Sequence, residues 1–146
     1  MEEVVKSPVT WDSVWIEIAQ VIAKKSKDLH TQVGCVLVSP DNRSAHLGFN
    51  GFPTGIKDTV ERLQRPQKYI RMLHSESNAI LNAKTDLSGW SCYLTMPPCD
   101  KCSLLLIQAG IKRIVYLNEP SSTAFDYKLS FELLAEAGVS IQKFQA

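Results

Sequence analysis

The sequence predicts a single α/β domain, residues 1–146, with helices on both faces of a β-sheet. Its 146 residues, 45% hydrophobic and 21% charged, have the length and composition of one globular domain. Two apolar segments before residue 50 are joined by a turn and predict a hairpin. Beyond residue 75 short apolar strands alternate with helices, an order that implies parallel pairing through right-handed crossovers.

The first helix is predicted to begin near Trp11. Thr10 or Asp12 can cap it, and its apolar residues recur at spacings of three and four. These residues are Trp11, Val14, Trp15, Ile18, Val21 and Ile22. A basic run at 24–27 then lies where a helix C-terminus favours cations. We interpret this run as a solvated helix end, with a phosphate role as the alternative because the run borders residues 28–31.

The hairpin follows directly. Residues 33–38 are a continuous apolar run, typical of a strand buried on both faces. A turn at 39–43 contains Pro, Asp and Asn, and residues 44–49 form the partner strand. Two glycines and a proline at 50–55 break this pattern, and a polar loop extends to about residue 71. A loop of this length is either functional or a surface insertion.

The second half predicts three helices and three strands in alternation. In chain order they are a helix at 75–83, a strand at 91–95, a helix at 103–109, a strand at 114–117, a helix at 127–137 and a strand at 139–144. Pro97 and Pro98 stop the first of these strands, and Gly110 and Gly138 close the last two helices. No internal repeat or linker divides the chain.

The charge balance argues against a nucleic-acid polymer as the substrate. The chain has 16 basic and 15 acidic residues, whereas a protein that grips a long polyanion carries a basic excess or stripe. A pocket for one small phosphate remains compatible with this balance.

The chain is expected to be cytoplasmic, with no membrane partner. No stretch approaches the roughly 18 apolar residues of a membrane span, and the acidic N-terminus lacks the basic and apolar regions of a signal peptide. Thiols stay reduced in that compartment, so we interpret the four cysteines first as metal ligands, nucleophiles or core residues.

Two local motifs open predicted helices: His-Ser-Glu at 74–76 and Pro-Cys-Asp-Lys-Cys at 98–102. Cysteines three residues apart at a helix start aim both sulfurs at one point, and the helix dipole favours their thiolates. His74, Cys99 and Cys102 form a Cys₂His set of the kind that Zn²⁺ prefers. Three protein ligands leave one position open, as in catalytic zinc sites.

Glu76 is the predicted proton carrier of this site. It lies two residues from His74, and a nearby carboxylate helps a zinc-bound water to ionise. A Cys-x-x-Cys motif alone would also fit a redox pair or half of a structural zinc finger. Cys35 and Cys92 lie in apolar strands and are expected in the core.

The combined pattern, His-x-Glu followed by Pro-Cys-x-x-Cys, is the signature of zinc nucleobase deaminases. Over about positions 11–144 the chain resembles the deoxycytidylate (dCMP) deaminases of the cytidine-deaminase-like superfamily. The segments that carry the resemblance lie at 25–28, 31–34, 48–53, 74–80, 98–102, 108–112 and 137–139. Gly-Phe-Asn-Gly-Phe-Pro at 48–53 and Gln-Ala-Gly-Ile-Lys at 108–112 point to dCMP deaminases within the superfamily.

The resemblance implies a three-layer α/β/α sandwich around a five-stranded mixed sheet, and hydrolysis of dCMP to dUMP and ammonia for thymidylate synthesis. It implies that zinc binds the three ligands named above and that Glu76 carries protons from the zinc-bound water to the base and the departing amine. Asn50 would contact the nucleoside, and the loop with His30 and Thr31 would hold sugar and phosphate. Ser75 would lie beside the substrate.

The resemblance also implies regulation and assembly. Members are commonly homo-hexamers that dCTP with Mg²⁺ activates and dTTP inhibits. The effector site would include Asn50, Gly51 and Asp58. If the chain is phage-encoded, it would act in the host cytoplasm.

The chain departs from the family pattern at two points. Many members have His-Ala-Glu, whereas Ser75 stands here in place of Ala. Many also have Asp-Pro before Thr-Gln-Val-Gly, whereas this chain has Asp28-Leu29-His30. Without the proline the phosphate loop is looser, and His30 offers a partial charge there.

Three alternatives remain open at this stage. One is a dual-specificity enzyme that accepts dCMP and dCTP. Another is a tRNA or single-stranded DNA deaminase, which the charge balance and the lack of clustered arginines and aromatics disfavour. A non-catalytic zinc module is the third, and it would have no use for Glu76.

Overall fold

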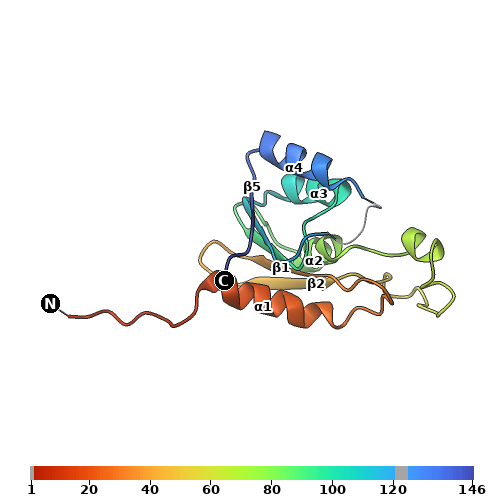
Figure 1. Cartoon of the computed structure of the whole chain (residues 1–146), viewed down its shortest axis with the longest axis horizontal. Coiled ribbons are helices and arrows are strands. Elements are labelled where there is room, and N and C mark those ends of the chain that lie inside the picture. The colour runs from red at the N-terminus through yellow and green to blue at the C-terminus, as the bar shows by residue number, and fades with distance from the viewer. Residues whose placement is uncertain (1, 121–124) are drawn as a thin grey trace.

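A computed structural model describes residues 2–120 and 125–146 and shows an α/β fold around one mixed sheet (Figure 1). Its helices are α1 (Trp11–Ala23), α2 (Ser75–Ala83), α3 (Asp100–Ala109) and α4 (Tyr127–Glu136), with a short 3₁₀ helix η1 (Gln67–Ile70). Its strands are β1 (Gly34–Val38), β2 (Ala45–Phe49), β3 (Ser91–Leu94), β4 (Arg113–Tyr116) and β5 (Ser140–Lys143).

The sheet is five-stranded with the order β2-β1-β3-β4-β5. Strand β1 is antiparallel to both β2 and β3, whereas β3, β4 and β5 are mutually parallel. The predicted hairpin and the predicted parallel half are both confirmed, and the sheet is mixed because β1 joins them.

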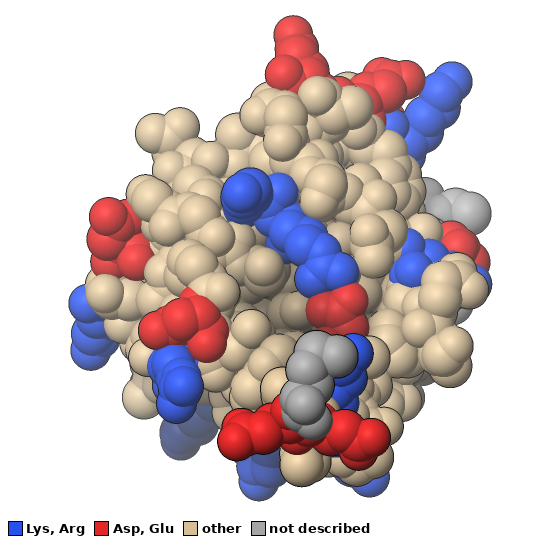
Figure 2. Space-filling model, turned by 90° about the vertical axis from the view of Figure 1, so that its left-hand side faces the viewer, with Lys and Arg blue, Asp and Glu red and all other residues tan. Residues whose placement is uncertain are grey.

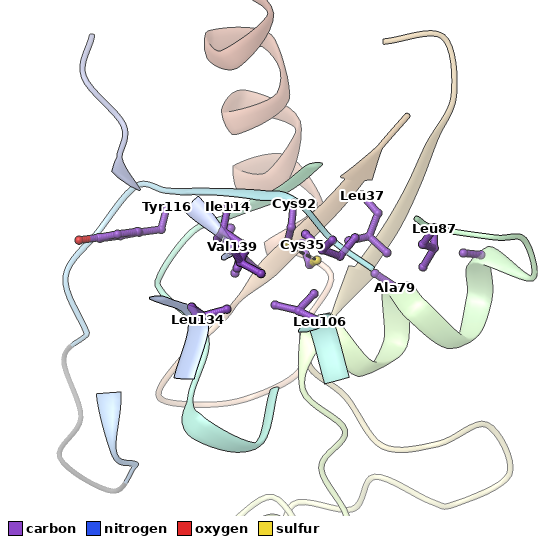
Figure 3. Close-up of a cluster of buried hydrophobic side chains, with 13 residues drawn as sticks. Cys35, Leu37, Ala79, Leu87, Cys92, Leu106, Ile114, Tyr116, Leu134 and Val139 are labelled. Carbon is purple, nitrogen blue, oxygen red and sulfur yellow. Dashed lines mark hydrogen bonds between the residues drawn. The ribbon is translucent and has the colours of Figure 1, made fainter. Parts of the chain in front are cut away.

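The sheet lies between two helical layers, so the three-layer prediction is confirmed. Alternate residues of β1 point to opposite faces, as the period of two requires. Val36 packs with Ile16 and Ala19 of α1, whereas Cys35 and Leu37 belong to the cluster beneath α2, α3 and α4. Figure 3 shows this second cluster, which contains Ala79, Leu87, Cys92, Leu106, Ile114, Leu134 and Val139. Both Cys35 and Cys92 are fully buried, as expected of core cysteines.

Two glycines of the hairpin allow helices to approach the strands closely. A Cβ at Gly34 would lie 1.9 Å from the carbonyl oxygen of Ala19 in α1. A Cβ at Gly48 would lie 2.3 Å from the carbonyl oxygen of Ser75 in α2. Because real Cβ atoms do not approach backbone this closely, only glycine fits at these positions.

Most element boundaries agree with the sequence to within a residue or two. The main difference is α3, which begins at Asp100 and not at 103, because Cys99 caps it by accepting a hydrogen bond from the backbone N–H of Cys102. The other is η1, which forms within the predicted loop. In the described ranges, no helix has the length and apolar character needed to span a bilayer.

Candidate active site

The starts of α2 and α3 bring three metal-ligating side chains together. His74 is the N-cap residue of α2, Cys99 is the N-cap residue of α3, and Cys102 lies in the first turn of α3. The Nδ1 atom of His74 lies 3.2 Å from Sγ of Cys102 and 3.5 Å from Sγ of Cys99. All three ligand atoms lie within 4.8 Å of one another.

This donor set fits zinc in both chemistry and spacing. Zinc bonds of about 2.0–2.3 Å in a tetrahedron separate the ligand atoms by about 3.4–3.8 Å, close to the observed distances. In the parts of the chain that are described, no fourth His, Cys, Asp or Glu joins the cluster. Three protein ligands leave one coordination position for water or substrate, as in a catalytic zinc site.

The two thiols of the cluster are electrostatically coupled. The hydrogen bond from Cys102 and the neighbouring His74 imidazole lower the pKa of Cys99 to about 4. The adjacent Cys99 sulfur and burial raise the pKa of Cys102. The pair therefore releases its first proton readily and its second with difficulty, and a bound cation favours loss of both.

Glu76 lies in the first turn of α2, buried to 4% exposure. Burial raises the pKa of its carboxyl group above the usual value of 4.5, while the Ser75 hydroxyl and the His74 imidazole oppose that rise. Ser75 is itself fully buried and donates a hydrogen bond of 2.7 Å to Oε1 of Glu76. A carboxyl group with a raised pKa is suited to accepting and returning a proton near neutral pH.

His74, Cys99 and Glu76 line one cavity of about 310 Å³, at the lower end of the range for small-molecule sites. Of the substrate residues predicted from the sequence, Thr31, Asn50 and Ser75 also line it. His30 does not, and its side chain is exposed.

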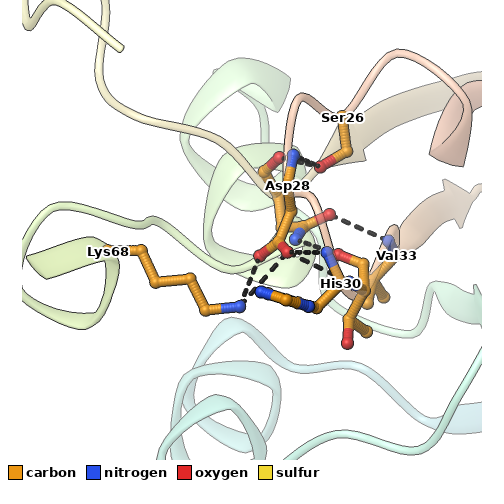
Figure 4. Close-up of polar contacts among 7 residues, drawn as sticks. Ser26, Asp28, His30, Val33 and Lys68 are labelled. Atoms are coloured by element: carbon orange, nitrogen blue, oxygen red, sulfur yellow. Dashed lines mark hydrogen bonds and ion pairs between the residues drawn. The ribbon is translucent and has the colours of Figure 1, made fainter. Parts of the chain in front are cut away.

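The loop before β1 is held by a buried ion pair (Figure 4). The carboxylate of Asp28 accepts hydrogen bonds from the backbone N–H groups of His30 and Thr31. It also pairs with Nζ of Lys68 in η1 at 3.1 Å, and both side chains are at most 5% exposed. Burial raises the pKa of Asp28, but these partners outweigh it and hold the pKa below its usual value of 3.8.

Asn50 fixes the same loop from the other side. Its Nδ2 donates to the carbonyl oxygen of Thr31 at 2.9 Å, and its Oδ1 accepts from the backbone N–H of Val33 at 2.8 Å. The amide group is thereby committed to shaping the cavity wall. A substrate contact from Asn50 stays a prediction.

The other two residues expected to bind an effector lie away from the cavity lining. Gly51 exchanges two backbone hydrogen bonds with Leu73, the residue before His74. Asp58 pairs with Lys27 at 2.7 Å on the surface.

Aromatic residues that the sequence analysis did not single out form another wall. The ring of Phe125 lies edge-on to the His74 imidazole at 5.1 Å and contacts Tyr69 and Tyr127, each at 6.5 Å. Burial and the nearby Cys99 raise the pKa of Tyr127 to about 12, so its hydroxyl stays a donor at neutral pH. No short motif marks these aromatics.

Arg65 also lines the cavity and was not predicted. Its side chain is exposed and, among the described residues, has no acidic group within 4 Å, whereas Lys68 is already paired with Asp28. Arg65 thus offers the cavity an uncompensated positive charge.

Known proteins match both the sequence and the fold. Residues 9–118 match the family model described as the cytidine and deoxycytidylate deaminase zinc-binding region. A human deoxycytidylate deaminase is 34% identical over 141 residues, which cover 92% of this chain and 79% of the relative. A probable deoxycytidylate deaminase from Caenorhabditis elegans is 40% identical over 116 residues, which cover 76% of this chain and 59% of the relative.

A solved structure extends the match to three dimensions. The dCMP deaminase of cyanophage S-TIM5, in complex with dCMP and dUMP, superposes with a TM-score of 0.73 at 26% identity and covers 90% of this chain and 95% of its own. The matched region contains all three zinc-type ligands and Glu76. By sequence, fold and ligand set, the chain belongs to the cytidine and deoxycytidylate deaminase family.

Proposed function

We propose that the chain hydrolyses dCMP to dUMP and ammonia, and so supplies dUMP for thymidylate synthesis. The observation that carries this proposal is that His74, Cys99 and Cys102 converge at the wall of a cavity that Glu76 also lines. The human relative and the cyanophage enzyme, which is named for dCMP and holds dCMP and dUMP, support dCMP as the substrate.

The residues of the cavity divide the chemistry between them. A zinc ion held by the three ligands would supply a bound water of lowered pKa as the nucleophile. Glu76 accepts one proton from the attacking water and passes it to N3 of the pyrimidine, and then accepts the second proton from the hydroxyl group added at C4 and passes it to the departing amine. Ser75 holds Oε1 of Glu76, and Phe125 packs against His74, so the proton carrier and a metal ligand each have a fixed neighbour.

Thr31, Asn50, Ser75 and His30 are our proposed substrate contacts, and Arg65 is added as a phosphate contact because it lines the cavity unpaired. If Arg65 binds the phosphate, Arg65→Met will raise the KM for dCMP and leave deoxycytidine unaffected. His30→Ala gives the same pattern only if His30 swings toward the substrate. Arg62→Met is the matched control, since Arg62 lies nearby but outside the cavity lining. Equal weakening of both substrates would remove the phosphate role.

Regulation and assembly are further proposals. We propose activation by dCTP with Mg²⁺, inhibition by dTTP, and a homo-hexamer in the cytoplasm. The backbone pairing of Gly51 with Leu73 supports an effector site at Asn50, Gly51 and Asp58, because it joins that loop to the residue before His74.

The test is ammonia release by the zinc-loaded protein from dCMP, CMP, deoxycytidine and dCTP, each with and without dCTP or dTTP as effector. We expect turnover of dCMP that dCTP raises and dTTP lowers. Turnover of dCTP would move the assignment to a dual-specificity enzyme. Absence of turnover on all four would overturn the proposal and direct the assay to tRNA and single-stranded DNA.

A further inference from the structure

We infer that Ser130, in helix α4 and 32 residues after Pro98 in the chain, is a positioning residue of the metal centre: it holds the peptide segment that carries the ligand Cys99. The inference rests on the metal site of the proposed function and adds to it a residue that touches neither metal nor substrate. It concerns how firmly the site keeps its metal.

The contacts form a small buried network. Ser130 Oγ donates to the carbonyl oxygen of Pro98 at 2.7 Å, and Ser103 Oγ donates to the carbonyl oxygen of Cys99 at 2.9 Å. The two hydroxyl oxygens lie 2.5 Å apart, and both serines are fully buried. Two hydroxyl groups from α3 and α4 thus contact two successive carbonyls around the ligand, with the Ser103 proton shared between the Cys99 carbonyl and Ser130 Oγ.

The two serines are not equivalent. The Cys99 carbonyl also accepts the backbone N–H of Ser103 at 2.9 Å, so it keeps a partner when the Ser103 hydroxyl is removed. The Pro98 carbonyl precedes α3, and within the described residues its donor is Ser130. Removing the Ser130 hydroxyl therefore leaves a buried carbonyl without a partner, which favours rotation of the Pro98–Cys99 peptide.

Rotation of this peptide would move the ligand itself. Pro98 is fully buried, and Cys99 Sγ lies 3.5 Å from Nδ1 of His74, a spacing that must hold for both to bind one ion. Groups that fix metal ligands by hydrogen bonds are typically worth 10- to 100-fold in metal affinity. Helix α4 is in turn seated by Leu134, a fully buried residue of the core.

The experiment measures zinc release from zinc-loaded protein into a chromogenic chelator, below the melting temperature of every variant. Ser130→Ala is expected to release zinc about 10- to 100-fold faster than the wild type. Ser103→Ala is the matched control: it removes an equally buried hydroxyl of the same pair but leaves both carbonyls with partners, so it should change release much less.

A second control separates anchoring from general loosening of α4. Leu134→Ala removes core packing of the same helix and leaves the Ser130 hydrogen bond in place. At comparable thermal stability, it should release zinc more slowly than Ser130→Ala.

Unchanged release from Ser130→Ala would overturn the inference, as would equal acceleration in Ser103→Ala or Leu134→Ala. The zinc content of the wild type and its turnover of dCMP are measured first. If the wild type holds no zinc, the proposed function itself fails; if it holds zinc and Ser130→Ala behaves like it, only the role of Ser130 fails.

Discussion

Glu76 shows how one buried side chain acquires its role from its neighbours. Burial favours the protonated carboxyl group and raises its pKa, and the Ser75 hydroxyl partly restores the carboxylate. The raised pKa makes protonation of the carboxyl group easier than for an exposed glutamate, which suits a proton carrier. Ser75 supplies a hydrogen bond to Glu76 that an alanine would lack.

Replacing Glu76 by Gln is expected to lower kcat by about 10²- to 10⁴-fold, because the amide cannot carry the proton. The ligands do not include Glu76, so zinc stoichiometry and melting temperature should stay near those of the wild type. Steady-state kinetics with metal analysis checks both, and the exposed Glu136→Gln serves as control. A Glu76→Gln variant with wild-type turnover would contradict the assigned role.

At this scale the sequence predicted the ligands and Glu76 because their spacing and helix-start positions carry the signal. Arg65, Phe125 and Tyr127 escaped prediction for a physical reason. They come from irregular segments or a helix start, and only the folded chain brings them into one cavity with His74. His30 shows the opposite case, a residue that the sequence placed in the site. Its backbone N–H donates a hydrogen bond to Asp28, but its side chain is exposed.

At the scale of elements, helix α2 can pack closely against strand β2 because Gly48 has no Cβ atom. The helix start with His74 and Glu76 rests directly on this contact. Any shift of α2 would move a metal ligand and the proton carrier together.

Gly48→Ala is therefore expected to lower the free energy of unfolding by about 1–3 kcal/mol through overpacking. It should also lower kcat under conditions in which the variant is still fully folded, because the shift of α2 displaces His74 and Glu76. Leu47→Ala is the control, because its side chain lies in the same strand but is exposed. Urea unfolding and kcat are measured on both. If the two variants are equally stable and active, the close packing of α2 does not matter.

The buried ion pair of Asp28 and Lys68 joins the loop before β1 to η1. It should make a large contribution to the loss of folding stability at acidic pH. Since the folded-state pKa of Asp28 is lowered, the pair contributes stability above the usual value of 3.8, and this contribution is lost as the pH falls through the folded-state pKa. Lys68→Met leaves a buried carboxylate unpaired and should cost about 3–5 kcal/mol at pH 7.

Urea unfolding at pH 7 and at pH 3 tests this, and the difference between Lys68→Met and wild type should shrink at the lower pH. Lys27→Met, which breaks the surface pair with Asp58, should have no measurable effect. A cost for Lys68→Met that does not change with pH would show that Asp28 is not the titrating partner.

Elements were predictable where the pattern is local. Apolar periodicity and caps located the helices and strands, and the alternation after residue 75 predicted the parallel half. Apolar periodicity placed the body of α3 at 103–109, whereas the motif at 98–102 had indicated the helix start that the structure shows at Asp100. The short helix η1 forms where buried Lys68 meets Asp28, a contact 40 residues apart in the chain.

For the molecule as a whole, the distribution of surface charge bears on which substrates the protein can bind. On the face shown in Figure 2, acidic and basic side chains are interspersed and no broad basic stripe is visible. This agrees with the near balance of charges in the sequence and with a small nucleotide as the substrate.

Removing zinc should lower the stability of the whole domain, because the metal joins the starts of α2 and α3. A ligand present at about 1,000 times its Kd stabilises the folded state by about 4 kcal/mol, so chelation should lower the Tm by about 10 °C. Calorimetry with and without chelator measures this, and added Zn²⁺, but not Mg²⁺, should restore the Tm. In Cys99→Ala the chelator should have no effect; an unchanged Tm in the wild type would show that the site holds no stabilising metal.

The position of Ser130 along the chain has a consequence for biosynthesis. A ribosome adds Ser130 about 28 residues after Cys102, a delay of a few seconds at about 5–20 residues per second. For that interval a nascent chain has all three zinc ligands but lacks the hydroxyl that holds the Pro98 carbonyl. If Ser130 anchors the metal centre as inferred, metal captured in that interval would be exchangeable until α4 docks.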